Sequence, residues 1–281
     1  MMEAAKKSGK AFGMMFNQRT NPMYQKMREM VQNGELGNLI RCVWIITDWY
    51  RTQSYYDSGE WRATWDGEGG GVLMNQCPHQ LDLWQWIFGM PTRIHAFCHE
   101  GKFHDIEVED DVTAYLEYEN GATGIFVTTT GETPGSNRFE ISGTKGKLLC
   151  ENDRLKWYKN AQDSREFSRT TKESFSRPDC ECVEVETDGE NPQHAGILNN
   201  FANALLGLEE FFVDGREGIK GVELMNAIEL SGWRGGAKVT LPVDEREYLE
   251  ELNKRCKASR KKVSVSAPPS DTRGSYGSRD K

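Results

Sequence analysis

Hydrophobic and polar positions recur along the chain in two periods, one of two residues and one of about 3.6, and their order predicts strands and helices. Residues 39–49, LIRCVWIITDW, combine β-branched and aromatic side chains as strands do. Further strand-like stretches lie at 93–100, 111–118, 123–131, 138–143, 147–152, 155–159 and 182–187. The dipeptides Asn120-Gly121 and Lys145-Gly146 stand where tight hairpin turns belong. Closely spaced strands joined by short turns predict an antiparallel sheet.

Helical patterns lie on both sides of these strands. Residues 2–8 indicate the end of a helix closed by Gly9, ahead of a predicted buried strand over 10–17. Asn21 and Pro22 predict a helix start, with a capping residue before a proline at the first helical position. The remaining predicted elements are helices over 72–88, 194–207, 217–231 and 244–255 and a short strand over 237–243. This order predicts an α+β layer arrangement.

Two stretches fit neither period. Residues 50–71 form an unusually long connection for a compact domain, and such connections are typically functional or disordered. Their tryptophan, tyrosine and arginine content is wrong for disorder, so we interpret them as a binding loop. Residues 257–281 are polar and basic without periodicity, and we predict that they form a disordered tail.

Composition narrows the class of protein. The formal net charge of -8 argues against a nucleic-acid partner, which requires a basic surface. No apolar run approaches the roughly 20 residues that span a membrane. The first residues, MMEAAKKSGK, lack a signal-peptide pattern, and the seven scattered cysteines favour reduced thiols over a disulfide framework. We therefore expect a cytoplasmic protein.

The sequence lacks the common nucleotide-binding motifs. GEGGGV at 67–72 has the wrong glycine spacing for a dinucleotide fingerprint and follows a loop rather than a strand. GREGIKG at 215–221 has neither a preceding strand nor the ending of a Walker A motif. Both are better interpreted as turns and helix boundaries, so we expect no nucleotide-binding half in this chain.

The stretch GEGGGVLMNQCPHQLDLWQWIFG at 67–89 holds the strongest candidate chemistry. On one helix, Asn75 and His79 would lie one turn apart and Asp82 would follow three residues later. Pro78 requires the helix either to kink or to begin there. If it begins there, His79 lies in the first turn, where the helix dipole favours the neutral imidazole, and Asp82 can bond the other ring nitrogen.

The glycines in front of that helix allow a substrate or cofactor to approach the backbone. The competing interpretation makes His79 a core histidine bonded to Asp82, with glycines that only turn the chain. Residue types alone leave these two interpretations equally supported.

The other candidate functional residues are individually weaker. His95, His99 and His104 supply at most two convergent ligands, and Cys180 with Cys182 forms a lone C-x-C, so we predict no metal site and place the three histidines at the surface. Arginines and aromatic residues concentrate around the long loop, where they suit hydroxyls, phosphates or a sugar ring: Arg19, Trp49, Tyr50, Arg51, Trp61, Arg62 and Trp65.

Four stretches resemble one known family in the order that the family has them. EGGGVLMNQCPHQLDLWQWIFGMP resembles the GGG-x-L-x-D-x-G-x-H-x-x-D segment of the Gfo/Idh/MocA oxidoreductases, which are NAD(P)-dependent sugar and polyol dehydrogenases. FGMMFNQRTNPMYQKMREMVQNGELGNL resembles the family's strand, N-x-R and helix. RFEISGTKGKL resembles its i-x-G-t-x-G hairpin, and GIKGVELMNAIELSGWRGGAKVTLPV resembles its C-terminal segment. The resemblance covers roughly residues 3–245.

The resemblance implies a fold and a domain division. Family members join a Rossmann domain to an α+β domain like the C-terminal domain of glyceraldehyde-3-phosphate dehydrogenase. That domain has a large, mostly antiparallel open sheet with helices on one face, and the sheet commonly supports dimers or tetramers. This chain resembles the second part: 1–9 as a remnant of the preceding helix, 10–256 as the substrate and catalytic domain, and 257–281 as the tail. The Rossmann domain and the E-K-P segment are expected to be missing.

The resemblance also assigns roles to residues. His79 falls on the catalytic histidine, Asn75 on a position where many members have aspartate, and Asp82 on the trailing aspartate of H-x-x-D. Arg19 falls on the N-x-R arginine near the site. To these we add, as our own inference, substrate contacts from Trp49, Tyr50, Arg51 and Arg62.

The expected function is the substrate-binding and catalytic half of an NAD(P)-dependent sugar or polyol oxidoreductase, inactive without a nucleotide-binding domain. Its cofactor would be NAD or NADP, and the chain would form a homo-oligomer. The alternative is a non-catalytic oligomerisation or carbohydrate-binding domain, which Asn75 and the missing lysine favour.

Overall fold

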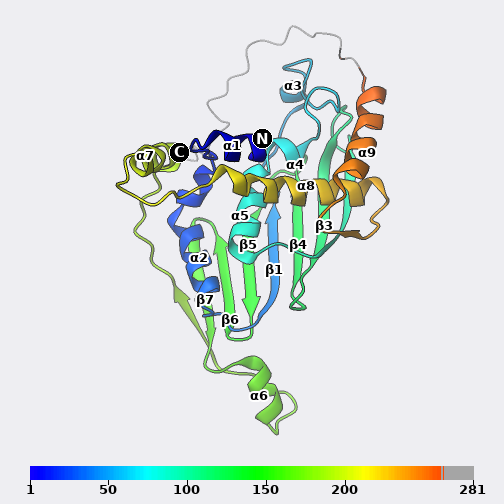
Figure 1. The fold of residues 1–281 in the computed structure, drawn as a ribbon. Coiled ribbons are helices and arrows are strands. Elements are labelled where there is room, and N and C mark those ends of the chain that lie inside the picture. The colour runs from blue at the N-terminus through cyan, green and yellow to red at the C-terminus, as the bar shows by residue number, and fades with distance from the viewer. Residues whose placement is uncertain (261, 263–281) are drawn as a thin grey trace.

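Nine strands form a single sheet in the computed structural model, which describes residues 1–260 and 262 (Figure 1). The strands are β1 (Leu39–Ile46), β2 (Arg93–Glu100), β3 (Glu109–Glu117), β4 (Thr123–Thr129), β5 (Asn137–Gly143), β6 (Gly146–Glu151), β7 (Arg154–Asn160), β8 (Cys180–Glu184) and β9 (Val239–Thr240). Their order across the sheet is β8-β7-β6-β5-β1-β4-β3-β2-β9.

The first strand lies in the middle of the sheet. β1 is parallel to β4 and antiparallel to β5, so that Val43 faces Ile125 on one side and Glu140 on the other. Every other strand pair within the described residues is antiparallel. The expected large and mostly antiparallel sheet is therefore observed.

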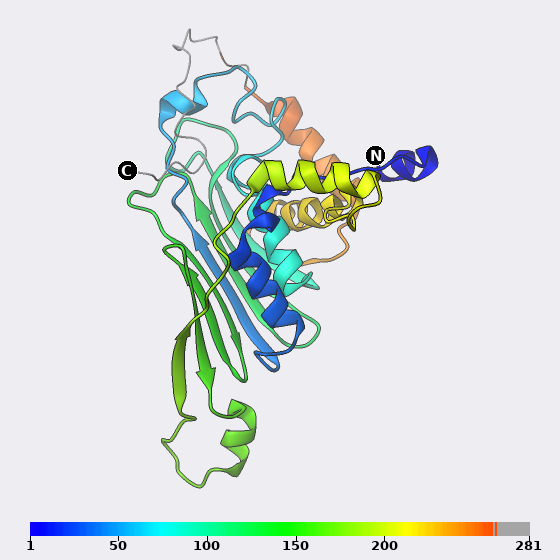
Figure 2. The same cartoon turned by 90° about the vertical axis from the view of Figure 1, so that its left-hand side faces the viewer.

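One face of this sheet is covered by helices. The described helices are α1 (Met2–Ser8), α2 (Pro22–Gln32), α3 (Gln53–Tyr56), α4 (Val72–Asn75), α5 (Pro78–Phe88), α6 (Ser164–Thr170), α7 (Gln193–Leu205), α8 (Gly218–Trp233) and α9 (Glu245–Ala258), with 3-10 helices η1 (Asn17–Thr20) and η2 (Gly215–Glu217), and not all of them contact the sheet. Figure 2 shows α2, α5 and α8 against one face, with no described helix on the other. None of the helices in residues 1–260 and 262 has the length and apolar character needed to cross a membrane.

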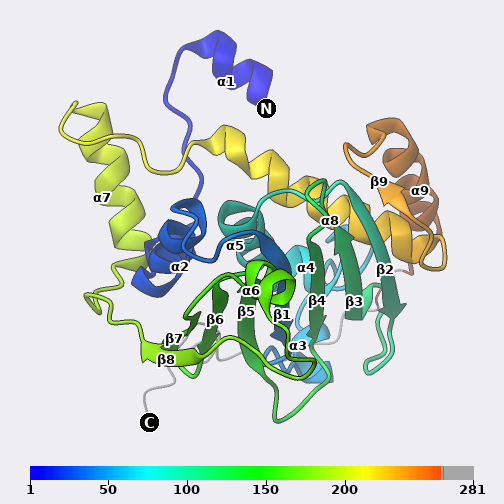
Figure 3. The same ribbon diagram turned by 90° about the horizontal axis from the view of Figure 1, so that it is seen from below.

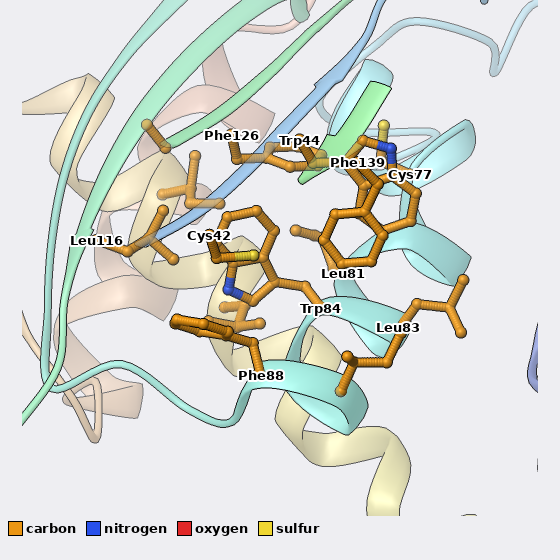
Figure 4. Packing of buried hydrophobic residues seen from close by; sticks show 14 of the residues in the cluster. Cys42, Trp44, Cys77, Leu81, Leu83, Trp84, Phe88, Leu116, Phe126 and Phe139 are labelled. Carbon is orange, nitrogen blue, oxygen red and sulfur yellow. The ribbon is translucent and has the colours of Figure 1, made fainter. Parts of the chain in front are cut away.

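The core lies between the central strands and α5. Alternate residues of a strand point to opposite faces, and Trp44 of β1 and Phe139 of β5 point toward the helices, where their rings stack at 4.2 Å (Figure 4). Trp84 of α5 meets Phe126 of β4 edge to face at 5.9 Å, and its indole nitrogen donates to the hydroxyl of Tyr118 at 2.6 Å. Aromatic packing of this kind fixes the position of α5 on the sheet.

Two expectations about elements need correction here. Residues 10–17 are not a strand, because Gly13 makes a single bridge to Asp214 in the connection before η2 instead of joining the sheet. The strand expected over 237–243 is only Val239–Thr240, and the proline at 242 has no amide hydrogen to continue the ladder.

The predictions for the two ends of the chain are confirmed only in part. Met2–Ser8 is a helix ended by Gly9, whose φ of 63° is left-handed, and Figure 3 shows α1 projecting away from the sheet and its covering helices. α9 continues to Ala258, two residues into the stretch predicted to be a disordered tail. Of that predicted tail, residues 261 and 263–281 lie outside the described residues.

Candidate active site

The helix expected over 72–88 is two helices. α4 ends at Asn75 and α5 begins at Pro78, with Cys77 in the capping position. Proline has no amide hydrogen to donate to a preceding turn, and its fixed φ suits the first position of a helix, so Pro78 starts α5. Of the two alternatives that Pro78 left open, a kink or a helix start, the structure shows the start, and His79 lies in the first turn. Asn75 and His79 are therefore not successive turns of one helix.

His79 is held in an environment that favours its neutral form. Its ring is half-buried and meets the ring of Phe16 edge to face at 6.3 Å. Its Nδ1 is buried and has no hydrogen-bond partner among residues 1–260 and 262. Burial lowers the pKa of His79, the charge of His194 lowers it further, and Asp82 opposes both. A neutral imidazole is the form that accepts a proton.

The carboxylate of Asp82 binds Arg19 rather than His79. Nε of Arg19 donates to Oδ2 of Asp82 at 2.7 Å, and Nη2 donates to Oδ1 at 2.6 Å, which is a two-pronged pair. Gln85 also donates to Oδ1 at 3.0 Å. The expected bond from Asp82 to His79 is therefore wrong, because both carboxylate oxygens have other partners.

Arg19 is buried and internally satisfied. Its side chain is 1% exposed, and its third donor, Nη1, binds Glu217 at 2.9 Å. Its guanidinium carbon lies 5.2 Å from the ring centres of Phe16 and of Trp86. Arg19 thus ties η1 to α5 and η2, and its burial among these partners argues against the substrate contact that we expected of it.

The glycine run serves packing. A methyl group on Gly71 would overlap the backbone oxygen of Glu109 in β3, and one on Gly70 would lie 2.8 Å from Oε1 of Glu229 in α8. The amide of Gly71 donates to both carboxylate oxygens of Glu109, at 2.8 and 2.9 Å, and that of Leu73 donates to one at 3.0 Å. The expectation that these glycines admit a substrate is corrected for Gly70 and Gly71: they let the start of α4 contact two carboxyl groups.

Those two carboxyl groups are buried together. Burial raises the pKa of Glu109 to about 7, although the amides of Leu73 and Gly71 favour the charged form. Burial and the neighbouring charge of Glu109 raise the pKa of Glu229 well above its ordinary value. The hydroxyl of Tyr248 donates to Glu229. Glu229 is therefore the group of the pair that holds a proton more firmly.

The long loop reaches the α4–α5 segment through Tyr55. Its hydroxyl donates to Oδ1 of Asn75 at 2.9 Å and accepts from Nη1 of Arg62 at 2.7 Å and from Gln76 at 3.2 Å. The amide group of Asn75 also donates to Glu68. Asn75 is thus joined to the loop, as part of a polar network.

The other predicted loop residues divide between exposed and buried. Nη1 of Arg51 donates to the backbone oxygens of Trp49 and Tyr50, at 3.3 and 3.0 Å. Tyr50 and Trp61 expose about half of their surface. Trp65 is buried and meets Trp233 edge to face, so it belongs to the core rather than to a sugar-binding surface.

His104 was expected at the surface and is buried. Its side chain is 7% exposed, its Nδ1 lies 2.9 Å from Oδ2 of Asp110, and its Nε2 lies 2.9 Å from the backbone oxygen of Arg51. His104 therefore anchors the loop to β3. His95 is half-buried and His99 exposed on β2, and no cluster of three metal-ligating side chains occurs among the described residues.

Sequence reasoning missed the start of α7. Asn17 donates to Gln193 at 2.6 Å, and Gln193 has a left-handed φ of 52°, which is uncommon outside glycine. This contact brings α7 to η1, beside α5, and His194 follows on α7 close enough to act on the pKa of His79. The sequence around Gln193 and His194 has no motif, so it could not have indicated that the start of α7 lies near His79.

A segment of the chain matches the model of one protein family. Residues 24–149 match the family model of the GFO/IDH/MocA C-terminal domain. This match supports the Gfo/Idh/MocA oxidoreductase family for that segment.

Particular relatives are oxidoreductases. The chain is 26% identical over 160 residues to the uncharacterized oxidoreductase YrbE of Bacillus subtilis (54% of this chain, 44% of YrbE). It is 24% identical over 160 residues to myo-inositol 2-dehydrogenase of Thermotoga maritima (55% and 45%). The chain spans about half the length of the curated relatives it matches.

Solved structures share the fold. The WlbA dehydrogenase from Bordetella pertussis, in complex with NADH and UDP-GlcNAcA, is 27% identical with a TM-score of 0.68, over 86% of this chain and 68% of that one. It is a dehydrogenase structure with NADH bound, which supports nicotinamide cofactor use in the family.

Replacing Asp82 by alanine is expected to leave Arg19 buried with only the half-exposed Glu217 as a counter-charge. Loss of one partner of a buried ion pair costs about 3–5 kcal/mol, whereas the double variant Arg19→Met/Asp82→Leu removes both charges and should recover much of this loss. Urea unfolding measures both. As a control, Glu29→Ala in the exposed pair with Lys26 should change stability by less than about 1 kcal/mol. Equal effects of Asp82→Ala and Glu29→Ala would contradict the assignment.

Glu109 should make stability depend on pH. Its pKa is about 7 in the folded protein against an ordinary 4.5, so the stability that the neutral carboxyl contributes is complete below pH 4.5 and lost as the pH rises through about 7. Glu109→Gln has no proton to lose there, and its unfolding free energy should fall less over that range. Glu119→Gln, an exposed site beyond the end of the same strand, is the control and should keep the wild-type pH dependence.

Proposed function

We propose that the whole chain belongs to the Gfo/Idh/MocA family and forms the substrate-binding and catalytic half of a sugar or polyol oxidoreductase. The single observation that carries the proposal is His79, neutral and half-buried in the first turn of α5, within a segment that the family model matches. Hydride would pass between a CH–OH group and NAD or NADP. His79 would accept the hydroxyl proton as a general base.

The described residues do not form a binding site for the diphosphate of a nicotinamide dinucleotide. Gly70 and Gly71 pack against Glu109 and Glu229, so they do not form a cradle for a diphosphate. The only parallel strand pair among residues 1–260 and 262 is β1–β4, without the repeated βαβ units of a dinucleotide-binding fold. We therefore assign to this chain the handling of the substrate and its proton, and we propose that the chain as given is inactive without a nucleotide-binding domain.

The residues around His79 have different roles in this proposal. Arg19 and Asp82 position α5, and Asn75 positions the loop through Tyr55. Trp49, Tyr50, Arg51 and Arg62 remain the proposed substrate contacts. All seven cysteines are free thiols, which supports a reducing compartment such as the cytoplasm.

Two measurements on the chain test this function. In an NMR titration, the His79 ring should become protonated with a midpoint below 6.5, because burial lowers its pKa, and its signals should shift when a sugar or polyol binds. In a protein that joins this chain to a dinucleotide-binding lobe, His79→Asn should lower kcat by about 10²- to 10⁴-fold. His95→Asn, on β2, is the matched control and should leave both readouts unchanged.

Fluorescence titration with NADH gives the opposing outcome. The chain alone should show no binding at micromolar NADH, because no diphosphate cradle exists in the described part. Micromolar binding, or NAD⁺ reduction by the chain alone, would contradict the proposal of a half-enzyme.

The helix-free face of the sheet supports a second role, assembly into a homo-oligomer. Val43 and Ile45 of β1 face Ile125 and Val127 of β4 in register, and they point away from the helices because Trp44 and Phe126 point toward them. Tyr115 lies beside Ile125 with 40% of its surface exposed. Such an apolar stripe is typical of a surface that a second subunit covers.

Introducing a charge into this stripe should separate the subunits. Tyr115→Glu is expected to shift the protein from a dimer or tetramer to a monomer in size-exclusion chromatography with light scattering. Phe175→Glu, at a fully exposed phenylalanine beyond α6, should leave the assembly intact. A wild-type chain that is monomeric at high concentration would overturn the assembly role and leave the proposal for His79 standing.

A further inference from the structure

Two arginines of the loop lie against one tyrosine ring and have no acidic partner. The guanidinium carbons of Arg51 and Arg62 lie 5.2 and 4.4 Å from the centre of the Tyr55 ring. Within residues 1–260 and 262, no carboxylate oxygen lies within 4 Å of either guanidinium, although the chain has 43 acidic residues. By contrast, Arg19 and Arg138 each bind two carboxylates.

Both guanidinium groups have N–H donors without an acceptor among the described residues. Arg51 uses Nη1 for two backbone oxygens of its own loop. Arg62 uses Nη1 for the hydroxyl of Tyr55, while its Nε is buried with no partner among the described residues. A guanidinium group has five N–H donors, so several on each arginine remain without a protein acceptor.

Two acidic residues of the loop are engaged elsewhere. Glu68 accepts from the side chain of Asn75 and from the backbone amide of Ala63. Asp57 accepts from the side chain of Gln53 at 3.0 Å. The positive charge of the arginine pair is therefore not neutralised by direct contact within its own loop.

The pair is held in place beside the candidate active site. Tyr55 connects it to Asn75, at the end of the helix that precedes α5 and His79. On the other side, the backbone oxygen of Arg51 is bound by His104, which is itself bound to the buried Asp110. An exposed aromatic ring, that of Trp61, lies 4.5 Å from the guanidinium carbon of Arg62.

We propose that Arg51 and Arg62 bind an anionic group, a carboxylate or a phosphate, carried by the sugar or polyol substrate. The planar guanidinium fork matches the two oxygens of either group. The assignment of this anion to the substrate rests on the function proposed above for His79. The sites are distinct in role: the arginine pair binds charge, and His79 moves a proton.

Calorimetric titration of the full chain tests this with matched ligands. Glucuronate and glucose 6-phosphate carry the two anions, glucose carries neither, and inorganic phosphate probes the site without a sugar. A hydrogen bond to a charged group is worth about 1.5–3 kcal/mol, so the better anionic sugar should bind roughly tenfold to a hundredfold more tightly than glucose. Which of the two binds more tightly tells a carboxylate from a phosphate.

Variants assign the preference to residues. Arg62→Gln and Arg51→Gln should each remove most of the difference, and Arg62→Lys should keep part of it, because lysine retains the charge without the fork. Arg41→Gln is the control. Arg41 is an exposed arginine of β1 that donates to Thr123 of β4, and its replacement should leave the binding of all these ligands unchanged. Partial binding by the lysine variant, and an unchanged thermal unfolding midpoint in the glutamine variants, would show that these variants lose binding rather than folding.

Each outcome has one meaning. Anionic sugars preferred through both arginines support the proposal. Equal binding of glucose and the anionic sugars overturns it and leaves the function of His79 intact. Binding of inorganic phosphate through the arginines without any sugar, together with His79 signals that no sugar shifts, supports the anion site and counts against the proposed function. No binding of any of these ligands overturns both.

Discussion

The candidate site depends on one buried ion pair. Arg19 of η1 binds Asp82 of α5 with two parallel hydrogen bonds and Glu217 of η2 with a third, so three segments far apart in the sequence meet at one guanidinium. Two charges taken out of water must stay together, since separating them would leave each without compensation. This requirement fixes the first turn of α5, and His79 with it, against η1 and the start of α7.

A second constraint acts on the other side of His79. The start of α4 contacts β3 because Gly71 has no side chain, and the carboxyl group of Glu109 accepts the amides that begin the helix. Pro78 then ends this short helix and starts the next one. Between these two constraints the α4–α5 segment has little freedom, and the polar network of Tyr55 and Asn75 attaches the long loop to it. In the function that we propose, this segment presents a neutral imidazole beside an arginine-bearing loop, and a hydroxylated, negatively charged molecule would bind between them.

Much of the fold was predictable from the chain. The period-two stretches and the turns at Asn120-Gly121 and Lys145-Gly146 correctly predicted β2 to β7, because β2–β4 and β5–β7 each pair in sequence order. The insertion of β1 between β4 and β5 was not predictable in this way. The segment 10–17 was wrongly predicted, since an apolar pattern specifies burial but not the partner, and here the partner is a connection rather than a strand. For the predicted site residues, the sequence indicated neighbours along the chain but not partners: Asn75, His79 and Asp82 lie in the α4–α5 segment, whereas Arg19 binds Asp82 from η1 and Tyr55 binds Asn75 from the loop.

By itself, the sequence determined where most strands and turns fall, and that Pro78 either kinks a helix or begins one; the structure shows that it begins α5. These are local properties, set by side-chain alternation and by the backbone chemistry of proline and glycine. Only the tertiary structure decided that Asp82 binds Arg19, that Asn75 binds Tyr55, and that the glycines meet Glu109 and Glu229. Buried polar groups require partners, but which partner they take depends on which distant elements the sheet and the core bring together.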